Sequence, residues 1–529
     1  MRARFLFRML LVVFSALIPC TAMAIDRTVV EKLATGDGED KLAAISALVS
    51  EGDARALVVL DALIDGELQT AGKQVLIVKG TDAVDAISGE KLAALPAERE
   101  DVTVNNRLRG AAQRGLAALK LLSPDRATRA AAVKALAGTD ESALLPVVKK
   151  AQATESDPAI KDALNQIAAS LELKTGTKDA RLASIKLLGQ SGNPSAKTLL
   201  LSVLDSDKDA DIQIEARASL RAVEGRLAWG ERLGMVFTGV SLGSILLLAA
   251  LGLAITYGLM GVINMAHGEL IMVGAYATYV VQNVFRAHLP GAFDWYLLCA
   301  VPVAFIVAAG VGMVLERTVI RWLYGRPLET LLATWGISLI LIQLVRTIFG
   351  AQNVQVENPA FMSGGIQVLA NVVLPWSRIV IIGFAAAVLI GMWLMLTRTR
   401  LGLFVRGVTQ NRAMASCVGV PTARVDTWAF GLGSGIAGLA GCALSQIGNV
   451  GPDLGQNYIV DSFMVVVLGG VGQLAGTVYA ALGLGFANKL LEAWSGAVLA
   501  KIAVLVFIII FIQKRPQGMF ALKGRSVEI

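Results

Sequence analysis

Histidine and cysteine are scarce in this sequence of 529 residues, which sets the first limit on its chemistry. The two histidines and four cysteines are His267, His288, Cys20, Cys299, Cys417 and Cys442. Two histidines are too few for a histidine-based metal site, and the absence of cysteine from residues 25–228 excludes a disulfide framework there. We therefore expect no metal ion, no catalytic residue and no cofactor held by this chain.

Phenylalanine, tyrosine and tryptophan are all absent from residues 25–228, where Ala, Leu, Lys and Asp recur at helical spacing. Similar segments, "KLAAISAL" from Lys41, "RAAAVKAL" from Arg129 and "RLASIKLL" from Arg181, each predict the start of a helix. A second helix follows each, which favours a HEAT-like solenoid, and an irregular helical bundle is the alternative. The β-branched stretch from Gln74, "QVLIVKG", predicts a small hairpin or ordered insertion.

Motifs for nucleotide hydrolysis and peptide hydrolysis are missing as well. The sequence contains no G-x-x-x-x-G-K-[ST] and no H-E-x-x-H. The sequence "GSGIAG" does satisfy G-x-G-x-x-G, but it lies in an apolar run and not in a βαβ unit. Its glycines instead indicate close helix packing, as do those of "VLGGVGQLAG". The expected packing positions are Gly431, Gly435, Gly438, Gly469, Gly470 and Gly472.

Long hydrophobic runs, by contrast, fill the chain from Met235 onward. About 20 apolar residues in a helix span the ~30 Å hydrocarbon core of a bilayer. The sequence predicts an all-α fold: a polytopic membrane domain of about nine spans, preceded by an exported, HEAT-like helical domain. The predicted spans start near Met235, Asn264, Tyr296, Leu331, Arg378, Thr427, Val460, Val478 and Val498.

The N-terminus predicts export. Arginines followed by a short apolar run and "AMA" indicate a signal peptide over residues 1–24, with a lipoprotein signal at Cys20 as the alternative. Residues 25–228 are then periplasmic and residues 229–529 form the membrane domain of an inner-membrane protein. Arginines and lysines cluster in the predicted cytoplasmic loops and tail, which places the C-terminus inside. The formal net charge of +7 therefore needs no nucleic acid partner.

One cytoplasmic loop, residues 398–426, predicts a short amphipathic helix. Thr409 can cap it, Gly419 and Pro421 can stop it, and Met414 with Val418 supplies an apolar edge. Such a helix could enter a groove on a soluble partner, or it could lie on lipid headgroups through the arginines of the loop.

Three polar residues, Asn264, His267 and Glu269, stand within an otherwise apolar stretch, "GLMGVINMAHGELIMVGAY". A structural interpretation makes Asn264 the N-cap of the second span and sets Glu269 favourably against the helix dipole. In a functional interpretation, the three line a polar pathway through the membrane. Elsewhere in the spans, Lys489 and Glu492 lie three residues apart and are predicted to pair.

Four motifs, "GLMGVINMAHGELIMVGAY", "TWGISLIL", "RGVTQNRAMASCVGV" and "VLGGVGQLAG", together resemble the permease subunits of branched-chain amino acid ABC importers. The resemblance begins near Met235. An exported extension is similar to the longer permease of urea importers, which implies urea as the substrate and a branched-chain amino acid as the alternative.

The resemblance also implies partners: a second permease subunit, two cytoplasmic ATPases that bind ATP-Mg, a periplasmic binding protein and the lipid bilayer. It implies that Thr409, Asn411, Arg412, Met414 and Val418 form the coupling helix that contacts an ATPase. A hypothesis from another class is a membrane receptor or scaffold whose exported domain binds a periplasmic protein.

Overall fold

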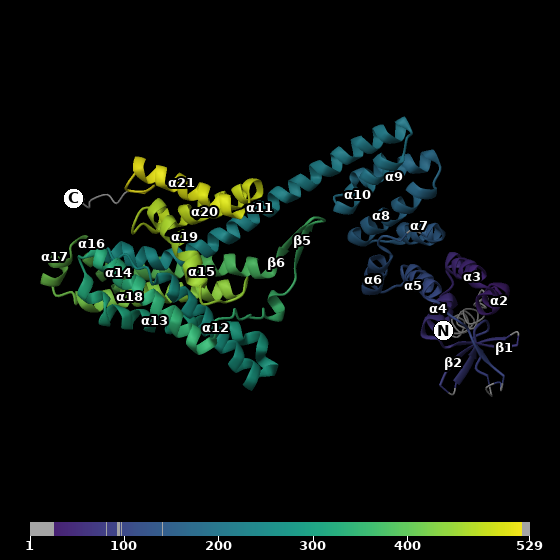
Figure 1. Ribbon diagram of the computed structural model, residues 1–529, viewed down its shortest axis with the longest axis horizontal. Coiled ribbons are helices and arrows are strands. Elements are labelled where there is room, and N and C mark those ends of the chain that lie inside the picture. The colour runs from purple at the N-terminus through teal and green to yellow at the C-terminus, as the bar shows by residue number, and fades with distance from the viewer. Residues whose placement is uncertain are drawn as a thin grey trace, which may run out of the picture. The chain divides into compact units, whose positions relative to one another are not determined.

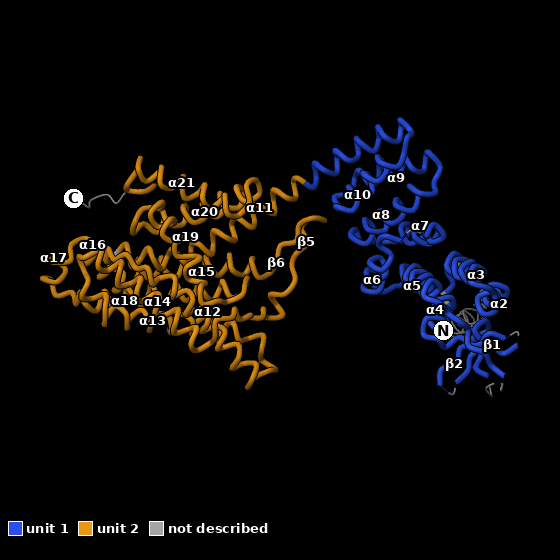
Figure 2. Tube along the Cα trace, viewed as in Figure 1, with its two compact units in different colours: residues 1–227 blue, residues 228–529 orange. Residues whose placement is uncertain are grey.

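The computed structural model describes residues 26–72, 74–80, 82–92, 96, 98–139 and 141–520. The expected signal peptide and the alternative site at Cys20 lie outside these residues. The chain divides into two compact units, unit 1 (Met1–Leu227) and unit 2 (Ala228–Ile529), shown in two colours in Figure 2. This division lies next to residue 228, the expected domain border, and falls within the helix α11 (Ala210–Met260).

Unit 1 is built mostly from short helices that start at polar caps (Figure 1). The α-helices described before α11 are α2 (Arg27–Thr35), α3 (Gly38–Glu51), α4 (Ala54–Asp65), α5 (Asn106–Lys120), α6 (Arg126–Leu136), α7 (Leu145–Thr154), α8 (Pro158–Thr175), α9 (Lys178–Gln190) and α10 (Pro194–Ser206). The three similar segments lie in α3, α6 and α9, and each helix begins three residues earlier than predicted. The reason is that Asp37, Asp125 and Thr177 accept backbone N–H groups at those earlier positions.

The predicted β-branched insertion is a four-stranded antiparallel sheet. Its strands, β1 (Leu68–Ala71), β2 (Gln74–Lys79), β3 (Asp82–Asp85) and β4 (Glu100–Asp101), pair in the order β3-β2-β1-β4. Val75, Leu76 and Ile77 of β2 are buried, so the apolar run that predicted the strand forms part of the core of unit 1.

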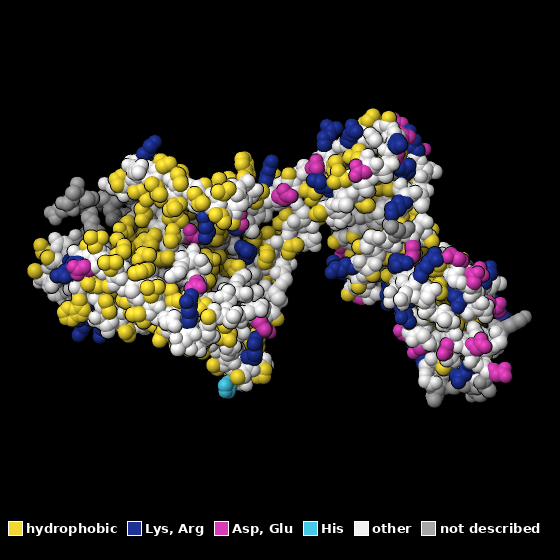
Figure 3. Space-filling view, in the orientation of Figure 1, with side chains coloured by type: hydrophobic (Ala, Val, Ile, Leu, Met, Phe, Trp, Pro, Cys, Tyr) yellow, Lys and Arg dark blue, Asp and Glu magenta, His cyan; other side chains and the backbone are white. Residues whose placement is uncertain are grey.

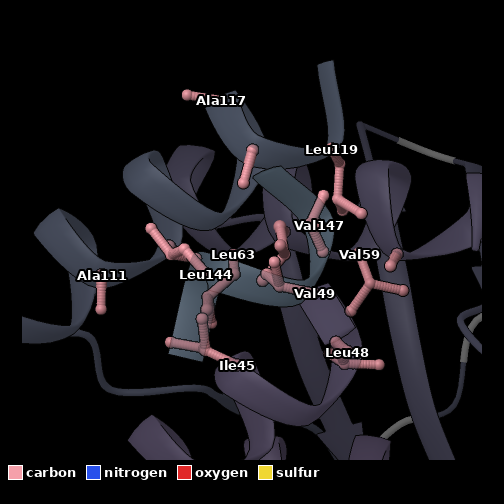
Figure 4. Packing of buried hydrophobic residues seen from close by; sticks show 14 of the residues in the cluster. Ile45, Leu48, Val49, Val59, Leu63, Ala111, Ala117, Leu119, Leu144 and Val147 are labelled. Atoms are coloured by element: carbon pink, nitrogen blue, oxygen red, sulfur yellow. The ribbon is translucent and has the colours of Figure 1, made fainter. Parts of the chain in front are cut away.

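The core of unit 1 contains aliphatic side chains and alanines without a single aromatic ring. Figure 4 shows Ile45, Leu48 and Val49 of α3 packed among side chains of the neighbouring helices. Small residues allow this close approach: a Cβ added to Gly115 would lie 2.6 Å from Val49 Cγ2. Helix pairs with such a core are compatible with a HEAT-like solenoid, which stays a prediction.

An ion pair between Arg129 and Glu155 joins α6 to the segment between α7 and α8. Arg129 Nε donates to Glu155 Oε2 at 2.8 Å, and the Glu155 side chain is only 2% exposed. Glu155 Oε1 also accepts from the backbone N–H of Asp157 at 2.9 Å. The hydrogen bond from Arg129, followed by that from Asp157, holds the pKa of Glu155 below its ordinary value of 4.5.

We expect Glu155→Gln to lower the unfolding temperature of unit 1, because it leaves Arg129 without its carboxylate. A lowered carboxyl pKa contributes stability that is present above pH 4.5 and is lost as the pH falls through the folded-state value. Thermal unfolding by circular dichroism across this range measures both effects. Glu39→Gln is the control, since Glu39 and its partner Arg107 are 74% and 70% exposed. Equal effects of the two substitutions would contradict the prediction.

Unit 2 is a bundle of long apolar helices. After α11 come α12 (His267–His288), α13 (Tyr296–Thr318), α14 (Pro327–Phe349), α15 (Trp376–Arg398), α16 (Arg400–Gln410), α17 (Arg412–Cys417), α18 (Thr422–Ser445), α19 (Leu454–Gly469), α20 (Leu474–Ser495) and α21 (Ala497–Lys514). A hairpin of β5 (Gly365–Leu369) and β6 (Val372–Pro375) precedes α15. Hydrophobic side chains cover much of the visible face of unit 2 in Figure 3.

Each of the nine predicted spans corresponds to a helix, which supports a polytopic helical membrane domain. In the part of the chain that the structure describes, seven helices are long and apolar enough to cross a membrane. The two predicted spans outside this set are α12 and α19. α12 carries the charged or polar residues Glu269, Gln282 and Arg286, and α19 has only 16 residues.

Helix α18 packs against α11, α12 and α13. It is almost wholly buried, and glycines bring the backbones together. A Cβ on Gly438 would lie 2.5 Å from the carbonyl oxygen of Ala304 in α13, and one on Gly441 would overlap the carbonyl oxygen of Ile271 in α12. Backbone therefore meets backbone at Gly438 and Gly441.

Candidate functional site

The chain turns sharply between α11 and α12, and this turn carries the three polar residues singled out in the sequence. Asn264, His267 and Glu269 are 0%, 0% and 1% exposed. The prediction that Asn264 is the N-cap of α12 is wrong. Ala266 occupies that position, and Asn264 Oδ1 instead accepts the N–H of Ala266 at 3.0 Å within the preceding turn.

His267 and Glu269 join α12 to two other helices. His267 Nε2 lies 3.0 Å from the carbonyl oxygen of Ala249 in α11. A carbonyl oxygen only accepts, so Nε2 carries the proton and Nδ1 is an acceptor. Glu269 Oε1 accepts from Ser338 Oγ of α14 at 2.9 Å. The motif "TWGISLIL" that supplied part of the family resemblance thus faces the polar end of α12.

Each of the three residues also has one buried polar atom without a partner. Among the described residues, Asn264 Nδ2, His267 Nδ1 and Glu269 Oε2 form no hydrogen bond. Burying such a group unpaired costs a few kcal/mol. One donor and two acceptors are therefore available to a molecule outside this chain. This is what a polar pathway requires, and the functional interpretation stays a prediction.

The predicted coupling helix is two helices, α16 and α17, which meet at Asn411. Thr409 is not a cap, because it lies inside α16 and its hydroxyl donates to the carbonyl of Val405 at 2.7 Å. Asn411 caps α17, and its Oδ1 accepts the N–H of Met414 at 2.9 Å. Met414 and Val418 are 62% and 76% exposed, so this segment presents apolar side chains on its surface.

The end of this segment has the geometry expected from Gly419 and Pro421. Gly419 has a φ of +92°, a backbone conformation that favours glycine, and the next helix, α18, starts directly after Pro421.

A buried polar network anchors α17 to the bundle, and sequence reasoning did not find it. Arg412 of α17 forms an ion pair with Asp426 of α18, whose side chain is 3% exposed. The Arg412 guanidinium carbon also lies 5.1 Å from the centre of the Tyr324 ring. Tyr324 then donates to Glu316 Oε1 of α13 at 2.9 Å, and Thr427 of α18 donates to Glu316 Oε2 at 2.7 Å.

The protonation of Tyr324 fits this arrangement. Burial, together with the nearby Glu316, raises the pKa of Tyr324, so its hydroxyl remains a donor. The network connects the exposed segment α16–α17 to the start of α18 through an ion pair, and to the end of α13 through a cation–π contact and a hydrogen bond.

The glycines selected for packing lie at close contacts. A Cβ on Gly435 would lie 2.5 Å from the Phe305 ring, and one on Gly431 would overlap Met313. Between α19 and α20, a Cβ on Gly469 would lie 2.5 Å from the carbonyl carbon of Gly476. Gly470 and Gly472 have φ values of +98° and +80° in the turn that joins these two helices.

Lys489 and Glu492 pair at 2.7 Å, which confirms the predicted contact. Within the described ranges, no group of three or more His, Cys, Asp or Glu residues could hold a metal ion.

Comparison with known proteins identifies the family. A family model described as "Branched-chain amino acid transport system / permease component" matches residues 235–513. The high-affinity branched-chain amino acid transport system permease protein LivH of Escherichia coli K12 is 29% identical over 298 residues, which cover 54% of this chain and 94% of that protein.

Two more relatives bear similar names. BraD of Pseudomonas aeruginosa is 26% identical over 293 residues, covering 54% of this chain and 95% of that protein. The probable LivH of Methanocaldococcus jannaschii is 25% identical over 314 residues, covering 56% and 94%. No solved structure gives a significant match. With the helical bundle of unit 2 matched over nearly its whole length, the chain belongs to the family of permease components of branched-chain amino acid transport systems.

Proposed function

We propose that this chain is the transmembrane permease subunit of an ABC importer that takes up a branched-chain amino acid. The observation that carries the proposal is the family match over residues 235–513, which includes the bundle, the turn at Asn264 and the segment α16–α17. The match favours a permease over the receptor or scaffold hypothesis. The importer would contain a second permease subunit, two ATPases that bind ATP-Mg and a periplasmic binding protein.

The segment α16–α17 would be the contact for an ATPase. Its exposed Met414 and Val418 suit insertion into an apolar groove, and Arg412 connects them to α18 and, through Tyr324, to α13. In this proposal the segment lies in the cytoplasm and unit 1 in the periplasm of an inner-membrane protein, and the charge pattern of the loops supports that orientation.

Urea is the second candidate substrate, and unit 1 is the observation that favours it. The branched-chain relatives described above align over 54–56% of this chain, and the family match starts only at residue 235, after unit 1. An exported extension is the feature that resembles the longer permease of urea importers. The two substrates differ in charge, since an amino acid is a zwitterion and urea is neutral.

Uptake of radiolabelled leucine and urea by cells lacking this gene tests the proposal. We expect leucine uptake to be lost and to return when the gene is restored, while urea uptake under nitrogen limitation is unchanged. The opposite result would overturn the amino acid assignment in favour of urea. Detergent extraction should recover the ATPases with the permease, and their absence would contradict an importer subunit.

A further inference from the structure

Unit 2 contains a cavity of about 420 Å³, a size typical of small-molecule sites. Its walls come from α11, the first turn of α15, the end of α18 and the connection that follows it, the first turns of α19, the last turns of α20 and the first turn of α21. None of the residues at the Asn264 turn lines it, so it is distinct from the site described above.

Charges of both signs line this cavity inside a bundle that is otherwise apolar. Asp461 of α19 is 9% exposed, and its Oδ2 lies 3.7 Å from Lys501 Nζ, which is too long for a tight ion pair. The Asn488 side chain is 8% exposed, and its Oδ1 accepts no hydrogen bond from any described residue. The cavity therefore offers a carboxylate and an amide oxygen that can receive N–H donors.

Arg378 supplies a positive charge to the cavity. Arg378 of α15 contacts the hydroxyl of Ser241 at 3.5 Å through Nη1, and no carboxylate in the described ranges forms an ion pair with it. Lys489, by contrast, is already paired with Glu492. A guanidinium without a carboxylate partner in a partly buried cavity is suited to binding a carboxylate or carbonyl oxygen.

Another part of the wall is apolar. It is formed by Leu242 and Ile245 of α11, Leu444 of α18, and Ile447 just after α18. The aliphatic side chain of a small solute would bury its surface against this part of the wall. The polar groups of the same solute would then contact Arg378, Asp461 and Asn488.

We propose that this cavity binds the imported solute inside the permease. Arg378 receives the carboxylate or carbonyl oxygen of the solute, and Asp461 with Asn488 Oδ1 accepts its N–H groups. The chemical class is a small molecule with an oxygen acceptor beside N–H donors, which an aliphatic amino acid and urea share. This inference rests on the proposed importer function and adds to it a binding site for the solute.

Protection of a cysteine in the cavity wall from modification tests the site directly. The full importer complex carrying Ile447→Cys is treated with a water-soluble maleimide, and labelling at position 447 is followed by mass spectrometry with and without millimolar leucine or urea. We expect the transported solute to slow labelling about tenfold. Leu454→Cys reports from another wall of the same cavity.

Matched variants separate binding from indirect effects. Arg286→Cys is the control, because Arg286 is 52% exposed outside the cavity and should label equally with or without solute. Adding Arg378→Gln to Ile447→Cys should remove the protection, and adding Arg378→Lys should retain part of it.

The outcomes distinguish this inference from the function on which it depends. Protection by leucine or by urea supports the site and identifies the solute. If cells import one of the two but neither cavity cysteine is protected, the site is overturned and the importer stands. If cells with the intact gene import neither solute, the proposed function fails.

Discussion

Replacing Arg412 with alanine is expected to abolish solute uptake, because it removes the charged contact between the segment α16–α17 and the bundle. Asp426 would then keep a buried charge with no cation beside it. Removing one partner of a fully buried ion pair costs about 3–5 kcal/mol, and the cost here is smaller because the Arg412 side chain is 45% exposed. We expect uptake in cells to fall to background, and the amount of ATPase recovered with the permease to fall as well.

A second substitution distinguishes the loss of coupling from the loss of folding. Arg412→Ala combined with Asp426→Asn no longer contains the lone buried charge, so the amount of folded permease should recover. Uptake should stay low, because the connection to α18 is still missing. Normal uptake in the single variant, or full recovery of uptake in the double variant, would show that Arg412 does not couple the two parts.

The other large effect is expected from Gly441→Ala in α18. The added Cβ would overlap the carbonyl oxygen of Ile271 and lie 2.7 Å from the backbone nitrogen of Ala275, both in α12. Overpacking a core costs about 1–3 kcal/mol, and backbone atoms yield less than side chains do. We expect most of the permease to be lost from the folded, monodisperse fraction after detergent extraction, as measured by size-exclusion chromatography.

Gly310→Ala in α13 is the matched control. Apart from the neighbouring backbone of its own helix, no atom of the described residues lies within 4 Å of a Cβ built at Gly310, although it is also a glycine within an apolar helix. Alanine favours helix over glycine by up to about 1 kcal/mol, so this variant should be recovered at or above the wild-type level. Equal losses at positions 310 and 441 would show that the close crossing of α12 and α18 is not what makes Gly441 necessary.

The sequence was sufficient to predict the helices and the approximate starts of the spans. The apolar runs of the spans persist over 16 residues or more. In a run of that length, a few polar residues do not obscure the pattern that predicts a helix. The sheet in unit 1 was also visible as a β-branched run. Lys489 and Glu492 could be paired because three residues on one helix is a local distance.

The sequence was misleading or silent where the backbone conformation of one turn sets a helix start, or where a contact joins residues far apart in the chain. Asn264 and Thr409 both have the side chain of a cap, but whether a residue stands at a helix start depends on the turn before it. The network at Arg412 was missed because its members lie far apart in the sequence: Glu316 and Thr427 are 111 positions apart. The cavity at Arg378 is lined by residues of several helices, so no short stretch of sequence predicts it.

The crossings of α18 with α12 and α13 limit how the permease can move. Where backbone touches backbone, there are no flexible side chains that could reshuffle to let one helix slide past another. These three helices should therefore travel together as a rigid block. Opening and closing of the route would then fall to the helices around the block, such as α15 and α21, which are much less buried than α18.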